Sequence, residues 1–412
     1  MFIERRNSSF KIVKTNMNKL NSPFTPGNPV PVELFVGREE QIKEVLRYVK
    51  QTLSGRQQNV FLIGDRGIGK SSLASFLRHY VNTKFDILCI HAFLGSVSTL
   101  KEMVHRIFEQ LLKETRSYKW YENIKGFFGK YIREVGLFGI SVSFNPPEED
   151  LKELVNKFPE ILNNILEKIK DQKRGLFIIL DDINGLAELK EFADWYKSFV
   201  DEVATHYKDF PVFIMLVGLP EKRDKLSRLQ PSLMRIFKII EIGRLSDNEV
   251  KNFLYKAFNS VNMEIKEDAL ELMVKFSSGL PILMHEIGDA TFWLDEDGII
   301  DLKDAMIGIL KAAEEVGRKY LDPKVYRAIR SEKYRSILRK MGEMRISKTF
   351  NKKEIESKLE PQERKVLNNF LRKLKKLGVI ESDLEGRGSY RFVNEIYPIY
   401  IWMESNKPKR NK

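Results

Sequence analysis

The chain has 412 residues, 42% of them hydrophobic and 31% charged, which suggests two to four domains of roughly 100–200 residues and excludes disordered, collagenous and repetitive chains. No run comes near the roughly 18 uncharged apolar residues of a membrane span, and the start, MFIERRNSSFK, lacks the apolar centre of a signal peptide. The single cysteine, Cys89, cannot form an internal disulfide or a thiolate metal site. We therefore expect a cytoplasmic protein. The net charge is +13, and residues 331–412 hold 21 basic against 11 acidic residues, or +10, which predicts a polyanionic partner for that end.

Residues 1–33 predict an extended arm, because their prolines are incompatible with a helix or a central strand. From Phe35 onward, short apolar runs alternate with amphipathic stretches. The runs are Val60–Ile63, Ile87–Ile90, Leu176–Leu180 and Val212–Val217, and the helical stretches are 40–52, 71–81, 99–114 and 150–169. Continuous apolar runs are typical of strands covered on both faces, so residues 34–244 predict an α/β domain with a parallel sheet.

Residues 115–149 do not fit this alternation and predict an insertion. They contain Trp120, Tyr121, Phe127, Phe128, Tyr131 and Phe138, followed by a strand-like segment at 139–144. We expect the aromatic side chains to fold back onto the core, where such residues are found more often than at interfaces. Contact with a protein partner, DNA or a membrane surface is the alternative.

The strongest local signal is GDRGIGKS at residues 64–71, which matches GxxxxGK[ST] between a predicted strand and a predicted helix. Glycines let the loop bring its backbone N–H groups close to phosphates, and the positive end of the following helix faces the anion. Lys70 can then reach the β- and γ-phosphates, and Ser71 can ligate Mg²⁺. The predicted nucleotide-binding residues of this loop are Gly64, Asp65, Arg66, Gly67, Ile68, Gly69, Lys70, Ser71 and Ser72.

A second predicted strand ends in two carboxylates, Asp181 and Asp182. Asp181 is expected to hold the Mg²⁺ shell, and Asp182 to orient or polarise the attacking water. The alternative is a pair that caps the next helix. Together with the loop, the pair predicts binding of ATP or ADP with Mg²⁺, whereas hydrolysis depends on Asp182.

After Gly243 we expect helices only, at 247–260, 267–277, 282–295 and 302–320, with Ser246 and Glu249 forming a capping box. This predicts an all-helical unit at residues 245–330. A separate basic domain is expected at residues 331–412.

The basic end predicts a helix at 334–342, a second at 350–359 and a third that starts at Pro361. The third has an apolar face of Val366, Phe370, Leu371, Leu374 and Leu377. Strands at 379–380 and 390–392 are expected to flank a tip at Gly386-Arg387-Gly388. This order is similar to a winged helix-turn-helix, whose third helix enters the major groove of DNA.

The predicted contacts to double-stranded DNA are Arg372, Lys373, Lys375, Lys376 and Arg387. Because lysines dominate the segment, contacts to phosphates should outweigh readout of bases. Two alternatives stay open for the basic end: a protein-docking module and a lysine-rich surface that serves solubility.

The loop, the acidic pair and the box Leu34-Phe35-Val36-Gly37-Arg38 resemble P-loop ATPases of the AAA+ and STAND group in archaea and bacteria, in particular origin-recognition initiators with a C-terminal winged helix. The resemblance covers about residues 21–403. It implies an ATPase with an AAA+-type core, a helical lid and a winged helix, and an adenine pocket lined by Phe35, Val36, Gly37 and Arg38.

The resemblance also implies two residues outside these motifs. Arg235 would be an arginine finger that reaches the γ-phosphate of a neighbouring subunit in a nucleotide-dependent homo-oligomer. Pro281, in Gly279-Leu280-Pro281, would pack near the base. The alternatives are an arginine paired with a carboxylate at a helix end, and a proline that simply begins a helix.

Two departures from the family bear on hydrolysis. The family usually has Glu where this chain has Asp182, and it often has a polar sensor residue where this chain has Gly218-Leu219-Pro220. We therefore expect a slow switch with a turnover below about 1 s⁻¹. The alternatives are a nucleotide-dependent signalling or defence switch, in which the winged helix binds protein, and a small-molecule kinase.

Overall fold

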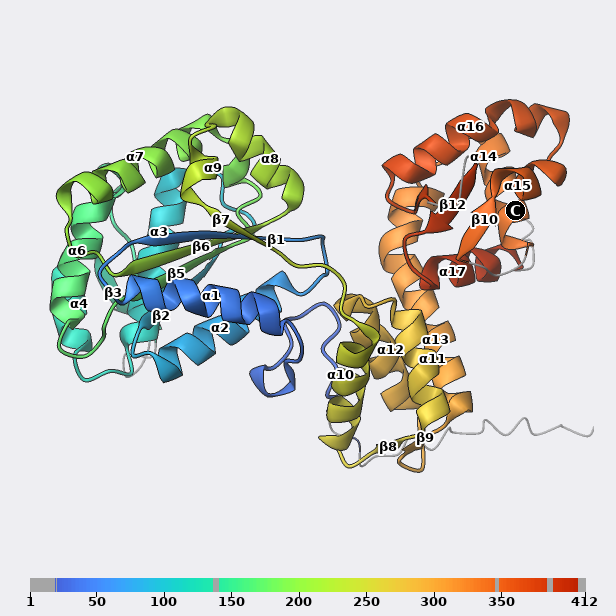
Figure 1. Cartoon of the computed structure of the whole chain (residues 1–412), viewed down its shortest axis with the longest axis horizontal. Coiled ribbons are helices and arrows are strands. Elements are labelled where there is room, and N and C mark those ends of the chain that lie inside the picture. The colour runs from blue at the N-terminus through green and yellow to red at the C-terminus, as the bar shows by residue number, and fades with distance from the viewer. Residues whose placement is uncertain (1–18, 20, 136–140, 345–347, 384–387, 407–412) are drawn as a thin grey trace, which may run out of the picture. The chain divides into compact units, whose positions relative to one another are not determined.

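The structure is a computed structural model that describes residues 19, 21–135, 141–344, 348–383 and 388–406 (Figure 1). It divides into two compact units. The first comprises residues 29–245, and the second comprises residues 1–28 together with 246–412. The boundary after Leu245 lies one residue beyond the expected end of the α/β domain, while the division expected near 331 lies inside the second unit and stays a prediction.

The first unit is built on a five-stranded parallel sheet with the order β2-β5-β6-β1-β7. Its strands are β1 (Gln58–Ile63), β2 (Leu88–Phe93), β5 (Leu176–Asp181), β6 (Val212–Gly218) and β7 (Lys238–Glu241). The predicted parallel sheet is therefore confirmed. Strands β5 and β6 are buried at every residue, as expected for strands covered on both faces.

The helices of this unit are α1 (Glu39–Thr52), α2 (Lys70–Lys84), α3 (Leu100–Thr115), α5 (Glu148–Asn156), α6 (Phe158–Ile169), α7 (Lys190–His206), α8 (Pro220–Leu229) and α9 (Leu233–Ile236). The expectation of a single helix at 150–169 is wrong, because the helical conformation is interrupted at Lys157, between α5 and α6. Pro159 has no N–H to donate to the carbonyl of Val155. That carbonyl instead accepts a hydrogen bond from the indole of Trp195 at 3.1 Å.

The insertion forms helix α4 (Tyr121–Phe127) and an antiparallel pair, β3 (Ile132–Val135) with β4 (Ser141–Phe144). Its rings fold back on the core, as expected. Phe128 and Phe144 are buried, and their ring centroids lie 5.1 Å and 6.1 Å from that of Phe108 on α3. Phe138 lies outside the described residues.

The second unit begins with helices α10 (Asp247–Asn259), α11 (Glu267–Ser277), α12 (Pro281–Leu294) and α13 (Leu302–Val316), and a π-helix, η4, follows at Gly317–Tyr326. The predicted capping box at the start of α10 is present. The expectation of helices only is wrong, because β8 (Glu264–Ile265) and β9 (Ile299–Ile300) pair in parallel. Strands of two residues are too short to produce a periodic pattern. In the described part of the chain, no helix is long and apolar enough to span a bilayer.

The basic end contains α14 (Glu332–Gly342), α15 (Lys352–Ser357) and α16 (Pro361–Lys376), followed by the hairpin β11 (Ile380–Ser382) and β12 (Ser389–Phe392). The helix expected at 350–359 starts later, because β10 (Thr349–Asn351) pairs with β12 and Asn351 then caps α15. A further helix, α17 (Ile396–Ser405), was not expected and packs on α13 and α14.

The N-terminal arm is anchored in the helical part of the second unit. Phe24 is 3% exposed, and its ring makes edge contacts with Phe253, Phe258 and His285. It lies over Gly288 of α12, where a Cβ would come within 2.2 Å of the phenyl ring. Only glycine at position 288 leaves room for this side chain.

Polar groups hold the arm on both sides of Phe24. The backbone N–H of Thr25 donates to Nδ1 of His285 at 3.0 Å. The ammonium of Lys19 donates to the carbonyls of Phe292 and Asp295 and to the buried Asp295 carboxylate, at 2.6 to 2.9 Å. The arm is therefore a packed part of the second unit rather than a free extension at these residues.

The buried histidine makes the stability of this unit depend on pH. Burial lowers the pKa of His285 from 6.5 to about 4. Between these pH values the imidazole binds a proton in the unfolded chain but not in the folded chain. The contribution of the neutral His285 to the free energy of unfolding is therefore complete above pH 6.5 and is lost as the pH falls toward 4. In urea denaturation, wild type should lose roughly 2 kcal/mol more than His285→Gln between pH 7.5 and 4.5. Equal losses would contradict the prediction.

Candidate nucleotide site and basic helix

The loop between β1 and α2 turns tightly at the carboxyl edge of the sheet. Gly67 and Gly69 have φ angles of 78° and 93°, which glycine adopts without strain. A Cβ on Gly64 would lie 2.7 Å from the carbonyl oxygen of Ile242 and 2.9 Å from Cγ2 of Ile68. Helix α2 begins directly after the turn, so its first N–H groups, which lack partners inside the helix, lie at the loop.

The loop residues differ in exposure in a way that suits an anion site. Asp65 and Arg66 are exposed, Ile68 is buried, and Lys70, Ser71 and Ser72 are half-buried. The ammonium of Lys70 donates to the carbonyls of Gly64 and Asp65 at 2.8 Å each. Burial lowers the pKa of Lys70, and the carboxylates of Asp181, Asp65 and Asp182 act in the opposite direction. The structure thus brings the loop lysine and the acidic pair within electrostatic reach.

Asp181 is the last residue of β5, and its carboxylate is 2% exposed. Its Oδ2 lies 3.1 Å from Nε2 of His91 on the neighbouring strand β2. The imidazole is in turn stacked on Phe93 at 4.3 Å between ring centroids. Sequence reasoning missed His91, although a polar residue directly after the apolar run Ile87–Ile90 was the signal for it.

Asp182 is exposed and has a left-handed backbone, with φ of 59°. Its carboxylate accepts a hydrogen bond from the amide of Asn184, and a Cβ on Gly95 would lie 2.7 Å from its Oδ2. The amide oxygen of Asn184 accepts from the N–H of Leu219 at 3.3 Å. Asn184, which sequence reasoning also missed, therefore joins the acidic pair to the turn after β6, where this chain has Gly218-Leu219-Pro220.

The reading of the acidic pair as a helix cap is wrong. The residues that follow it form a turn and a short 3-10 helix at Leu186–Glu188, whose cap position is Gly185. The next α-helix, α7, starts only at Lys190 after Leu189. The two carboxylates are thus left at the sheet edge, beside the loop.

The box at residues 34–38 lies against the phosphate loop. Gly37 and Arg38 have φ angles of 73° and 64°, and the buried guanidinium of Arg38 donates to the carbonyl of Ile68 at 3.1 Å. The Phe35 ring stacks on Phe76 of α2 at 4.6 Å. Val36 and Gly37 are half-buried between these two contacts.

The other two residues singled out by the resemblance lie in different units. Arg235 is exposed on α9, just before β7, and within the described ranges no carboxylate forms an ion pair with it. Pro281 begins α12 after Gly279, whose φ is 67°, as expected from its position alone.

The basic helix α16 has one apolar and one charged face. Its buried apolar side chains are Leu367, Phe370, Leu371 and Leu374; Val366 and Leu377, which were assigned to this face, are only half-buried. Arg372, Lys375 and Lys376 are exposed and Lys373 is half-buried, with the Lys375 ammonium donating to the hydroxyl of Ser382 at 2.7 Å. Arg387 lies outside the described residues.

One carboxylate fixes the inner face of this helix. Burial would raise the pKa of Glu363, but hydrogen bonds from Lys340, Ser336 and the Glu360 N–H outweigh burial and lower the pKa to about 2. The Lys340 ammonium on α14 lies 2.7 Å from the carboxylate. The charged pair therefore holds α16 on α14 at neutral pH.

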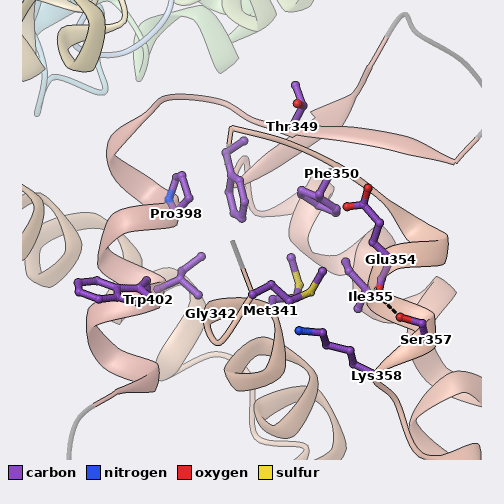
Figure 2. A pocket seen from close by; sticks show the side chains of 13 residues that line it. Met341, Gly342, Thr349, Phe350, Glu354, Ile355, Ser357, Lys358, Pro398 and Trp402 are labelled. Carbon is purple, nitrogen blue, oxygen red and sulfur yellow. Dashed lines mark hydrogen bonds between the residues drawn. The ribbon is translucent and has the colours of Figure 1, made fainter. Parts of the chain in front are cut away.

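The second unit also contains a cavity of about 570 Å³ that involves α14, α15 and α17 (Figure 2). Apolar side chains such as Met341, Ile355 and Trp402 line it together with polar ones, and Glu354, Ser357 and Lys358 lie together at one side.

The sheet order and the loop at its edge define a P-loop nucleoside triphosphatase core. Residues 34–195 match the AAA ATPase domain family, so this part of the chain is an AAA ATPase domain. The chain is similar over 93% of its length to the ORC2 protein of Aeropyrum pernix in ADPNP-ADP complexes, with 13% identity, 95% of that chain covered and a TM-score of 0.58. The ADP form of that protein gives a TM-score of 0.52 at 13% identity, with 94% of this chain and 100% of that chain covered. Over the matched part of its length, the chain thus has the AAA+ fold of that protein.

A sequence relative comes from Methanocaldococcus jannaschii and is named as an uncharacterized HTH-type transcriptional regulator. It is 22% identical over 301 residues, which cover 68% of this chain and 69% of that protein. The relation extends well beyond the AAA ATPase domain.

Proposed function

We propose that this protein is an ATP-binding AAA+ ATPase that hydrolyses ATP slowly and acts as a nucleotide-dependent switch on double-stranded DNA. The observation that carries the proposal is the meeting of Lys70, at the start of α2, with Asp181 and Asp182, at the end of β5. A helix start, a lysine and two carboxylates at one sheet edge are the groups that a magnesium nucleoside triphosphate needs.

The residues fit such a ligand in distinct roles. Backbone N–H groups of residues 64–70 and the ammonium of Lys70 hold the phosphates, after Lys70 gives up its bonds to the loop carbonyls. Ser71 and Asp181 hold Mg²⁺, which when bound neutralises charge on the phosphate oxygens. Asp182 orients the water. The box Phe35–Arg38 receives the adenine.

Two features of the acidic pair support slow turnover. Asp182 is one methylene shorter than Glu, and its carboxylate already accepts a hydrogen bond from Asn184. A general base must come within hydrogen-bonding distance of the water from which it takes a proton. A short side chain that is already held by Asn184 comes less easily within that distance of a water at the γ-phosphate. Nucleotide state then changes slowly enough to act as a signal.

The DNA-binding role rests on the C-terminal segment. Its helices and hairpin follow the order of a winged helix-turn-helix, and its net charge of +10 is concentrated in 82 residues. The charged side of α16 presents Arg372, Lys375 and Lys376 to solvent, which suits insertion into a major groove. The relation to an HTH-type regulator supports the same reading.

Removal of the loop lysine should weaken nucleotide binding. We expect Lys70→Ala to lose at least tenfold in affinity for ATP and ADP, measured by fluorescence titration, because a charged donor to the phosphates is gone. Wild-type turnover should stay below about 1 s⁻¹ in a phosphate-release assay. Lys84→Ala, at the other end of α2, is the matched control and should bind as wild type. A wild-type rate of tens per second would contradict the switch.

Arg235 is expected to act across subunits. Arg235→Ala should leave ATP affinity within about twofold and lower hydrolysis by 10³-fold or more, since an arginine finger stabilises charge only in the transition state. Light scattering with ADP and with a non-hydrolysable ATP analogue, with and without duplex DNA, should show larger assemblies with the analogue. A monomer under all conditions would speak against a role in trans.

Duplex DNA binding should weaken steeply with salt. Each phosphate contact adds about 0.9 to the slope of log K against log salt, so Arg372→Gln together with Lys376→Gln should lower that slope by about 1.8. Lys303→Gln together with Lys311→Gln, an exposed pair on α13, is the matched control. Salt-independent affinity would contradict phosphate contacts, and no binding at low salt would favour the protein-docking alternative.

A further inference from the structure

We propose that His91 is a positioning residue that orients the Asp181 carboxylate for the magnesium ion. The proposal rests on the proposed nucleotide site and adds to it a residue on a different strand, outside both sequence motifs. It concerns binding of the ion, and not transfer of a proton.

The strand register places the two residues on one face of the sheet. Phe93 of β2 is paired with Asp181 of β5, and His91 with Ile179. Side chains two residues apart on a strand point to the same face, so His91 reaches Asp181 as a diagonal neighbour. The resulting contact, 3.1 Å from Nε2 to Oδ2, joins two side chains that are only 4% and 2% exposed.

This contact restricts how the carboxylate can turn. A hydrogen bond to Oδ2 opposes rotation of the carboxylate about its bond to Cβ, and it engages only one of the two oxygens. The other oxygen stays available to the ion or to a water bound to it, which are the partners that Mg²⁺ takes from carboxylates. Groups that hydrogen-bond to a ligating carboxylate in this way tune metal affinity.

Phe93 covers the pair at the sheet edge. Its ring stacks on the imidazole at an interplanar angle of 26° while 58% of the residue is exposed. Here the ring keeps water from the imidazole, and a hydrogen bond shielded from water constrains its partners more strongly.

A structural role and a positioning role lead to different results. A histidine that only satisfies a buried carboxylate supports the fold, so its loss should weaken nucleotide binding equally with and without metal. A histidine that orients the carboxylate for the ion should affect only the part of the binding that depends on Mg²⁺. The distinction requires measurements in EDTA as well as in Mg²⁺.

The test uses the full chain, fluorescent ADP and a series of MgCl₂ concentrations. In His91→Leu, the Mg²⁺ concentration at half-maximal enhancement of ADP binding should rise about 10- to 100-fold, while ADP affinity in EDTA stays within about twofold. His91→Gln, which keeps an N–H donor, should recover most of the loss. His206→Leu, at an exposed position at the end of α7, is the matched control and should behave as wild type.

Unchanged Mg²⁺ dependence in His91→Leu would overturn the proposal, and so would equal losses in EDTA and Mg²⁺. If His91→Leu does not fold, Phe93→Ala at the exposed cover should raise the Mg²⁺ requirement in the same direction, and no change there would overturn the proposal as well. Wild type that binds no ADP at any Mg²⁺ concentration would overturn the proposed function itself, whereas wild-type binding with an unaffected variant overturns this inference alone.

Discussion

The nucleotide site depends on a close approach of three backbone segments at Gly64. A Cβ at this position, directly after β1, would find no space, because the carbonyl of Ile242 after β7 and the side chain of Ile68 in the loop lie too close. The carbonyl of Gly64 also accepts a hydrogen bond from the Lys70 ammonium. Because interiors pack at the density of crystals, such a contact cannot be relaxed by a small shift. The position of α2, and therefore of its first N–H groups, follows from this contact.

The sequence predicted the features whose causes are local. Four of the five strands of the sheet, the phosphate loop, the acidic pair and the capping box before α10 each follow from neighbouring residues, and the structure has them. His91 and Asn184 could not be assigned to the site in this way, because their roles come from contacts between different segments. The sequence of one strand alone does not determine which residues of the neighbouring strand lie beside it. The same holds for β10, which exists only because β12 returns beside it.

The helical predictions failed where a single residue changes the outcome. One proline converts the expected helix at 150–169 into α5 and α6, and the indole of Trp195 satisfies the carbonyl that this frees. On α16 the buried face includes Leu367 rather than Val366, and Glu363 sits on the inner side as a charged pair with Lys340. Periodicity gives the face of a helix to within about one residue, and tertiary contacts decide the rest.

The backbone at Asp182 explains why this chain departs from the usual acid of its family. A left-handed conformation is tolerated by aspartate and asparagine, whose short polar side chains bond locally, and it disfavours longer residues. Gly95 faces the same carboxylate, and a Cβ there would lie 2.7 Å from its Oδ2, so the glycine at position 95 leaves room for the aspartate. An exchange of Asp182 for glutamate would therefore place a longer side chain on a left-handed backbone, and the turn would have to be rebuilt to accept it.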